Sequence, residues 1–115
     1  MRLIRKGDNS VLLTKLEIAR SFLKRLIGLL FRDHLSYEEG LLFPNCNMIH
    51  TLGMRFPIDV IFLDSQGRVV RIFPKYPPGR IMLWPVWSAS YVLEVADGSA
   101  SRWGLEVGDR LVWED

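Results

Sequence analysis

Cysteine and histidine are scarce in this chain. Its 115 residues include one cysteine, Cys46, and two histidines, His34 and His50. A single cysteine cannot close an internal disulfide, which is compatible with a reducing compartment and leaves stability to a hydrophobic core. A structural zinc ion usually takes three or four cysteine or histidine ligands. Because no ligand pair has a spacing such as CxxC, we expect neither a metal nor another cofactor.

Long apolar runs are also missing. No stretch approaches the ~18 apolar residues that a membrane-spanning helix needs. The first residues, "MRLIRKGDNSVLLTK", contain neither the apolar core nor the small-residue cleavage site of a signal peptide. We therefore expect a cytoplasmic protein without a membrane span. The composition, 49% hydrophobic and 24% charged, is typical of a globular chain, and the length fits one domain over residues 1–115.

Charge of one sign is not concentrated in any segment. The formal net charge is +2, and the arginines are spread from Arg2 to Arg110. A protein that binds nucleic acid usually gathers its basic side chains on one face. We therefore expect no nucleic-acid partner.

Short apolar segments separated by turn residues make up most of the chain. The turns are clearest in "GDNS" and "SQG", because glycine, aspartate and asparagine tolerate the backbone angles that tight turns need. The segments at 58–64 and 68–73 flank "SQG" and should form a hairpin. Strands are predicted over residues 1–6, 11–19, 40–44, 58–64, 68–73, 90–96 and 108–114.

One segment has the periodicity of a helix. In "SFLKRLIGLLF", residues 21–31, an apolar stripe lies opposite the basic pair Lys24 and Arg25, and Ser21 can cap the first turn. We predict a helix that packs on a sheet, with a basic helix on a membrane surface as the alternative. A shorter helical piece is predicted within "DGSASRWG", where Gly104 can end it in the left-handed conformation.

Many short strands and few helices predict a mostly β (β+α) domain. It would be a small barrel-like or sandwich domain with one main helix packed on it. The segment "IDVIFLD" is apolar on both faces, with Ile58, Val60 and Phe62 on one and Ile61 and Leu63 on the other. This pattern indicates a central strand that is covered on both sides.

Cys46 and His50 are the first pair to consider for catalysis. A nucleophilic cysteine needs a histidine or a positive field that lowers its pKa. The two residues are four positions apart, which makes them neighbours on a helical turn but places them ~13 Å apart on a strand. Pro44 and Asn45 precede them and favour a turn. Contact is therefore open, and an inert cysteine is the more common outcome.

Asp59 lies inside the most apolar strand, beside Ile61 on its own face. A buried carboxylate is costly unless it is paired or hydrogen-bonded. We expect a structural ion pair with Arg55, Arg80 or His50, or bonds from backbone N–H groups of the preceding turn. A functional alternative is a binding-site carboxylate that orients His50 and makes it more basic.

Further polar residues surround this strand. Asn47 and Thr51 could line a pocket or satisfy the backbone of a turn, and the second interpretation is favoured. Arg80 could contact an anion. Trp84 and Trp87 flank Pro85 in "LWPVW". We expect them to pack in the core, while the alternative is an exposed aromatic surface for a partner.

Two long segments resemble a known family. They are "CNMIHTLGMRFPIDVIFLDSQGRVVRI" and "YVLEVADGSASRWGLEVGDRL", with "RLIGLLFRDHLSYEEGLLF" upstream. They make the chain similar, over about residues 8–113, to the domain-of-unknown-function family numbered 192. The resemblance implies a compact β-rich, barrel-like domain and no established reaction. Some members have Trp-Met-Lys-Asn-Thr where this chain has "NMIHT", which weakens a catalytic role for Cys46 and His50.

The sequence favours a non-catalytic module that binds a small molecule or a partner protein. Its predicted ligand-binding residues are Asn47, His50, Thr51, Arg55, Asp59 and Arg80. The alternative is a small enzyme in which Cys46 is the nucleophile and His50 the base, for hydrolysis or thiol exchange. A third possibility is a structural protein that docks through its tryptophans.

Overall fold

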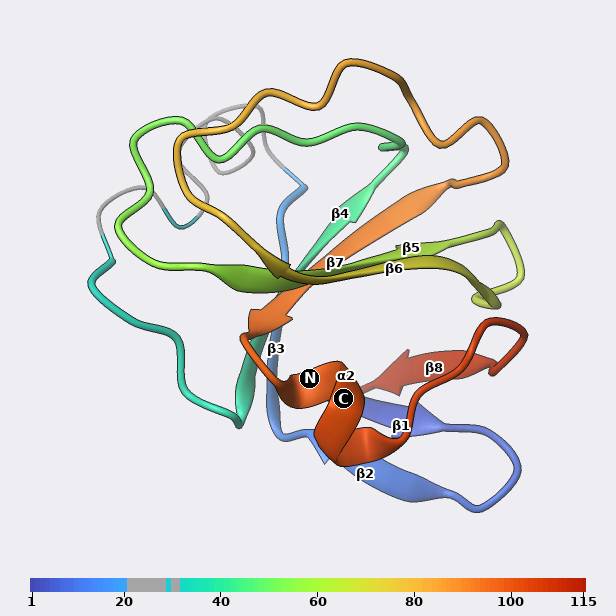
Figure 1. Ribbon diagram of the computed structural model, residues 1–115. Helices are drawn as coiled ribbons and strands as arrows, with labels where there is room; N and C mark the ends of the chain where they lie inside the picture. The colour runs from blue at the N-terminus through green and yellow to red at the C-terminus, as the bar shows by residue number, and fades with distance from the viewer. Residues whose placement is uncertain (21–28, 30–31) are drawn as a thin grey trace.

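The computed structural model describes residues 1–20, 29 and 32–115, which form two β-sheets and a short helix. Figure 1 shows the larger sheet in the middle, with long loops above it and the smaller sheet and the helix below. The fold class predicted from the sequence is confirmed as mostly β. Within the described residues the two sheets are separate, so the expected barrel is not closed.

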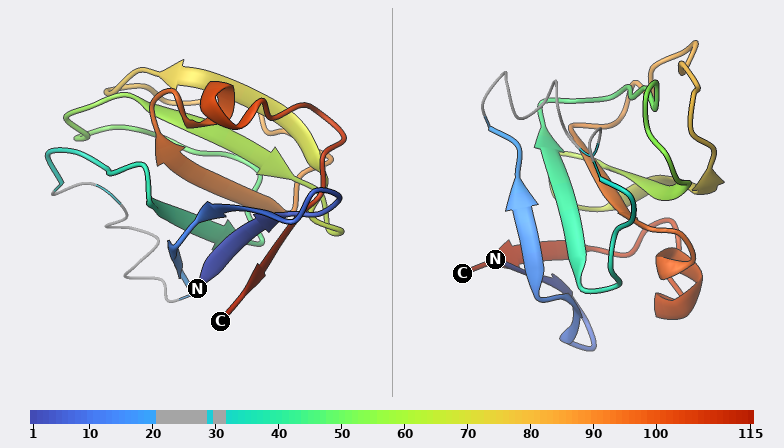
Figure 2. Two further views of the ribbon diagram at one scale, coloured as in Figure 1. Left: turned by 90° about the horizontal axis from the view of Figure 1, so that it is seen from below. Right: turned by 90° about the vertical axis from the view of Figure 1, so that its left-hand side faces the viewer.

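The smaller sheet has the strand order β2-β1-β8, from Ser10–Leu13, Arg2–Arg5 and Leu111–Glu114. The turn predicted at "GDNS" joins its first two strands, and Asn9 there has a φ of 58°. Strands β1 and β8 are antiparallel, with Arg2 opposite Glu114. The two ends of the chain therefore lie side by side (Figure 2).

The larger sheet has the order β3-β4-β7-β5-β6. Strands β3 and β4 are parallel, and the other neighbours are antiparallel. The predicted hairpin is confirmed as β5 and β6. The strands span Lys15–Ile18 for β3, Glu39–Pro44 for β4, Ile58–Leu63 for β5, Val69–Tyr76 for β6 and Tyr91–Ala96 for β7.

The single strand predicted over residues 11–19 is wrong, because the chain changes sheets at Thr14. Before Thr14, β2 pairs with β1 in the smaller sheet. After it, β3 pairs with β4 in the larger sheet. The backbone N–H groups of Thr14 and Lys15 both donate to the Glu38 carbonyl oxygen, at 3.2 and 3.0 Å. This shared acceptor marks the corner, which a run of apolar residues does not reveal.

Strand β5 is buried on both faces, as its sequence predicts. Ile61 and Leu63 belong to the core between the two sheets, together with Leu3, Leu42 and Leu93. The opposite face belongs to a second core under the long loops. That core contains Ile58, Val60 and Phe62 of β5, with Leu41, Phe43, Met82 and Val92 among its other members.

The only helix in the described residues is α2, Ser99–Trp103, and no helix there is long and apolar enough to cross a membrane. Gly104 ends α2 in the left-handed conformation, as predicted. The helix predicted over residues 21–31 lies outside the described residues, apart from Leu29.

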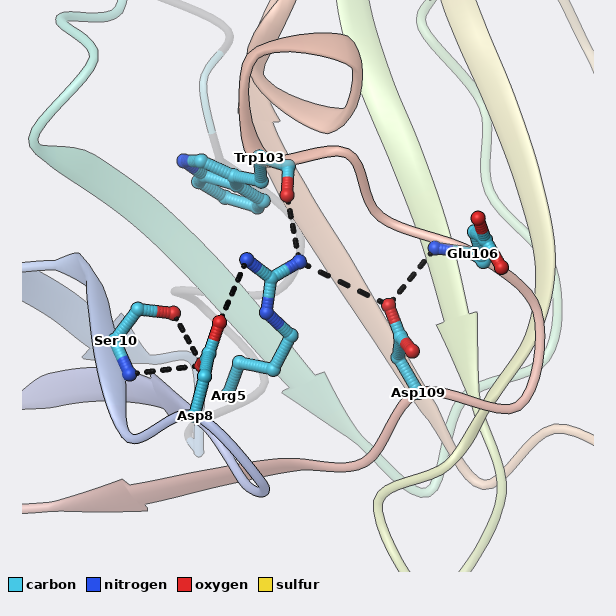
Figure 3. A network of polar contacts seen from close by, with 6 residues as sticks. All are labelled: Arg5, Asp8, Ser10, Trp103, Glu106 and Asp109. Atoms are coloured by element: carbon cyan, nitrogen blue, oxygen red, sulfur yellow. Dashed lines mark hydrogen bonds and ion pairs between the residues drawn. The ribbon is translucent and has the colours of Figure 1, made fainter.

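A polar network fastens α2 to the smaller sheet (Figure 3). The Arg5 guanidinium donates to the Trp103 carbonyl oxygen at 2.6 Å and lies 3.3 Å from the Asp8 carboxylate. Asp109 lies 3.9 Å from the same guanidinium and accepts a hydrogen bond from the Glu106 backbone N–H at 2.9 Å. Asp109 therefore has a structural role in the turn before β8.

Candidate functional site

Two long loops cross the same face of the larger sheet in opposite directions. Loop 45–57 leads from β4 to β5, and loop 77–90 leads from β6 to β7. Their backbones are bonded to each other along the way, from Val86 N to Asn47 O at 2.9 Å and from Thr51 N to Arg80 O at 2.8 Å. The result is an irregular two-stranded ribbon, which lies above the sheet in Figure 1. Most of the site residues that the sequence predicted lie in this ribbon.

Thr51 is fully buried and fastens the ribbon together. Its hydroxyl donates to the Pro77 carbonyl oxygen at 2.7 Å and accepts from the Arg80 backbone N–H at 3.0 Å. Its own carbonyl oxygen accepts from Gly79 N at 2.8 Å. These bonds match the favoured interpretation, in which Thr51 satisfies turn backbone.

Asp59 is 1% exposed and receives backbone hydrogen bonds. Its Oδ1 accepts from Lys75 N at 2.9 Å and Gly98 N at 3.3 Å, and its Oδ2 accepts from Ala100 N at 2.9 Å. The expected kind of partner, backbone N–H, is right, but the donors come from β6 and α2 and not from the preceding turn. Asp59 therefore ties the start of α2 to the larger sheet.

The two arginine candidates lie at the surface. Arg55 donates to Asp33 Oδ1 at 2.8 Å, so its ion pair is with a different aspartate from the one expected. Arg80 is exposed and contributes its backbone to the ribbon. Asn47 also contributes its backbone to the ribbon, because its carbonyl oxygen accepts a hydrogen bond from Val86 N.

Cys46 and His50 are not joined by a hydrogen bond in the described part of the chain. The Cys46 thiol donates to the Met48 carbonyl oxygen at 3.0 Å. His50 is exposed and pairs through its backbone with Ile81. This arrangement does not supply the thiolate–imidazolium contact that the enzyme hypothesis needs. No group of three or more potential metal ligands occurs among the described residues.

The tryptophans of the second loop are exposed, so the prediction that they pack in the core is wrong. Trp84 is 78% exposed and Trp87 82%. Within the loop, Met82 points into the core and is 8% exposed, while its neighbours Ile81 and Leu83 point outward. We use the name aromatic patch for the exposed set Ile81, Leu83, Trp84 and Trp87.

The sequence did not single out one acidic residue that is buried in the larger sheet. Glu94 is 5% exposed and lies in β7, between Leu41 of β4 and Val60 of β5. Burial raises the pKa of its carboxyl to about 8. Since cross-strand partners point to the same side of a sheet, Glu94 faces the loops. The signal was available, because "YVLEVA" places an acid among apolar residues as "IDVIFLD" does.

Comparison with known proteins gives a consistent result. Residues 3–113 match the model of the family DUF192, described as an uncharacterised ACR. A UPF0127 protein of Thermococcus sibiricus is 33% identical over 97% of this chain and 74% of its own length. One from Pyrococcus furiosus is 36% identical over 86% of each chain.

Two crystal structures have the same fold. A protein of unknown function from Novosphingobium aromaticivorans has a TM-score of 0.81 and 27% identity, covering 98% of this chain and 84% of its own. A Sinorhizobium meliloti protein, described as a candidate transcription regulator, has a TM-score of 0.81 and 28% identity, covering 96% and 89%.

Proposed function

The chain belongs to the DUF192 family, and we propose that it is a non-catalytic module that binds a partner protein through the aromatic patch. The observation that carries this proposal is the exposure of two tryptophans and two large aliphatic side chains on one loop. Tryptophan is enriched among the residues that dominate binding energy at protein interfaces. Exposing several such side chains together is unfavourable unless a partner covers them.

The ribbon presents these side chains in a fixed arrangement. Loop 77–90 is bonded to loop 45–57 at several points, and the buried Thr51 hydroxyl bonds the two ends of the segment 77–80. A surface that is ordered before binding loses less conformational entropy when the complex forms. This favours a folded protein surface as the occupant.

The charge of the ribbon indicates the chemistry of that partner. Loops 45–57 and 77–90 contain no aspartate or glutamate, but they contain His50, Arg55 and Arg80. His50 pairs with Ile81 of the patch, and Arg80 precedes it. The partner should therefore have an apolar centre that receives the tryptophans and an acidic rim near Arg80. The chain is expected to meet this partner in the cytoplasm.

The test begins with photo-crosslinking from a reactive side chain at position 83, followed by purification of the crosslinked protein. Its affinity is then measured by calorimetry for the wild type and for the double variant Trp84→Ala/Trp87→Ala. We expect the double variant to bind at least about a hundredfold more weakly. The matched control is Val107→Ser, because Val107 is 65% exposed outside the ribbon.

Three results would contradict the proposal. One is an unchanged affinity in the double variant. Another is self-association of the purified chain that the double variant abolishes, seen by analytical ultracentrifugation. The third is sedimentation with phosphatidylglycerol vesicles that depends on the tryptophans, which would make the patch a membrane contact. Cys46→Ser serves as a further check, because a binding module should stay folded and competent while a cysteine enzyme would lose its activity.

A further inference from the structure

Three basic residues from distant parts of the sequence lie side by side at one end of the smaller sheet. Arg68, in the β5–β6 hairpin, is the antiparallel bridge partner of Arg110, which directly precedes β8. On the other side of Arg110, Lys6 N donates to the Arg110 carbonyl oxygen at 2.8 Å and extends the β1–β8 ladder by one pair. We use the name basic row for Lys6, Arg110 and Arg68.

The two arginines form the closer kind of cross-strand pair. Backbone hydrogen bonds of 2.8 Å lie on either side of the pair, from Val69 N to Asp109 O and from Leu111 N to Gly67 O. Arg68 and Arg110 therefore do not bond each other through their backbones. In such a pair the Cα atoms are only ~4.5 Å apart, and the two side chains leave the same face.

The basic row points away from the core. Val69 and Leu111, the residues after Arg68 and Arg110, are both 1% exposed and belong to the core between the two sheets. Because successive side chains of a strand point in opposite directions, the two arginines point toward solvent. Arg68 and Lys6 are exposed, and Arg110 is half-buried.

No carboxylate of a described residue forms an ion pair with the basic row. The acids nearest in the chain have other partners. Asp64 Oδ1 accepts two backbone N–H groups of its own turn, at 2.8 and 2.9 Å, and Asp8 and Asp109 lie 3.3 and 3.9 Å from the Arg5 guanidinium. Like charges directly opposite each other destabilise a sheet. The row therefore lowers the stability of the chain unless an anion lies on it.

The guanidinium of Arg110 is already oriented. Its Nε donates to the Gln66 carbonyl oxygen at 3.0 Å, which also fastens the hairpin turn to the start of β8. No acceptor from the described part of the chain meets its Nη1 or Nη2. An arginine fork binds two oxygens of a phosphate or carboxylate at once, and orientation before binding reduces the entropy lost.

An apolar row lies beside the basic row on the same face. Ile4 and Val112 are opposite each other, two residues or ~7 Å farther along β1 and β8, and both are half-buried. Val11 of β2 is opposite Ile4 and is 47% exposed. The positive charge is therefore confined to one row, whereas a nucleic-acid backbone needs a longer basic stretch. The face fits a single anionic group on an apolar body.

We propose that the basic row binds the phosphate group of a small organic phosphate monoester, whose apolar body lies on Val11, Ile4 and Val112. The two arginines hydrogen-bond the phosphate oxygens, and Lys6 adds a third positive charge. No bond is made or broken in the ligand. The site lies on the smaller sheet, whereas the ribbon lies above the larger sheet (Figure 1), so this proposal is independent of the partner surface.

The experiment is a calorimetric titration of the full chain with phenyl phosphate at pH 7.5 and low ionic strength, where the ester carries about two negative charges. Phenol, which lacks the phosphate, and inorganic phosphate, which lacks the apolar body, serve as ligand controls. We expect phenyl phosphate to bind at millimolar concentration, with phenol at least about tenfold weaker and inorganic phosphate weaker by a smaller factor.

The variant Arg68→Gln should weaken phenyl phosphate at least about tenfold, because it removes one of the two arginines that bond the phosphate. The matched control is Arg102→Gln on α2. It removes the same charge from an exposed side chain whose guanidinium lies 3.9 Å from the Tyr37 ring centre, and it should leave binding unchanged.

Thermal unfolding gives a second measurement. At low ionic strength Arg68→Gln should have a higher midpoint than the wild type, because one of two opposed like charges is gone. Phenyl phosphate should raise the midpoint of the wild type more than that of Arg68→Gln. A lower midpoint for Arg68→Gln without ligand would contradict the repulsion on which the proposal rests.

Four binding results would overturn the proposal. They are no binding of phenyl phosphate to the wild type at millimolar concentration, equal binding of phenol, unchanged binding to folded Arg68→Gln, and an equal loss in Arg102→Gln, which would indicate only general charge attraction. Sedimentation with phosphatidic acid vesicles separates a lipid headgroup from a free ester. Binding to the vesicles without binding to phenyl phosphate would also contradict a small ligand.

Discussion

Asp59 and Glu94 lie on neighbouring strands of one sheet and point to opposite faces of it. Asp59 is opposite Val95, and Glu94 is opposite Val60, so the two carboxyls differ by one position in the register. Asp59 faces α2, and its carboxylate accepts three hydrogen bonds from backbone N–H groups. Glu94 faces the ribbon and receives no hydrogen bond from any described residue. Two acids in similar apolar strands therefore have different roles.

Glu94 should make stability depend on pH above the acid range. Its pKa is raised from 4.5 to about 8 in the folded chain, so the folded state holds a proton that the unfolded state has lost. The full contribution is present below pH 4.5 and is lost as the pH rises to about 8. Within this window the free energy of unfolding should fall by up to about 1.4 kcal/mol per pH unit.

Urea denaturation at a series of pH values measures this slope. Glu94→Gln cannot ionise, so its profile should be flatter than that of the wild type by the same amount. Identical slopes for the two proteins between pH 5 and 8 would show that the Glu94 carboxyl does not hold its proton in the folded state.

Asp59→Asn should destabilise the fold strongly. An amide has one acceptor oxygen and would turn its N–H₂ group toward at least one of the backbone donors Lys75, Gly98 and Ala100. We expect a loss of about 3 kcal/mol in the free energy of unfolding. Asp33→Asn is the control, since Asp33 forms an exposed pair with Arg55 and should cost less than about 1 kcal/mol. Equal effects of the two changes would remove Asp59 from this structural role.

Thr51→Val should loosen the ribbon. The change keeps the shape of the side chain but leaves the Pro77 carbonyl oxygen and the Arg80 N–H without the hydroxyl. We expect a loss of about 1–3 kcal/mol, measured by chemical denaturation, and faster amide exchange at Arg80. Thr14→Val, at an exposed position, should change neither quantity by much. Unchanged exchange at Arg80 in Thr51→Val would contradict the assignment.

Gly67→Ala tests the contact between the β5–β6 hairpin and β8. Gly67 has a φ of 80°, and a Cβ atom there would collide with the Leu111 carbonyl oxygen. Gly79 has a similar φ of 75°, but a Cβ atom there meets nothing within 4 Å. In both variants the left-handed backbone should lower the free energy of unfolding by about 1–2 kcal/mol. The collision with Leu111 should lower it further in Gly67→Ala alone. Thermal unfolding of the two variants compares them, and equal midpoints would rule out the collision.

Much of the fold was predictable because strand signals are local. The two apolar faces of "IDVIFLD" predicted that β5 would be central, and the "SQG" turn predicted the hairpin. The corner at Thr14 was not predictable, because an apolar run has the same pattern whether its strand stays in one sheet or passes to another. Strand order was equally hidden, since it depends on contacts between distant segments.

The candidate site was predicted less completely. The sequence placed Asn47, Thr51 and Arg80 in one candidate region, and the structure brings these three residues to the two loops that are bonded to each other. The sequence did not distinguish residues that form hydrogen bonds with the loop backbone from residues whose side chains remain available to a ligand or a partner. It placed Trp84 and Trp87 in the core because large aromatic side chains are usually buried there, whereas both are exposed.

By itself the sequence determined the β-rich class, the central position of β5, the main turns and the resemblance to a family. These follow from the two-residue period of strands and from the conformational preferences of glycine, asparagine and aspartate. Only the tertiary structure decided which buried carboxyl is satisfied and which apolar side chains meet solvent. Those outcomes depend on which N–H groups and which loops the folded chain brings to each face, and such neighbours are distant in the sequence.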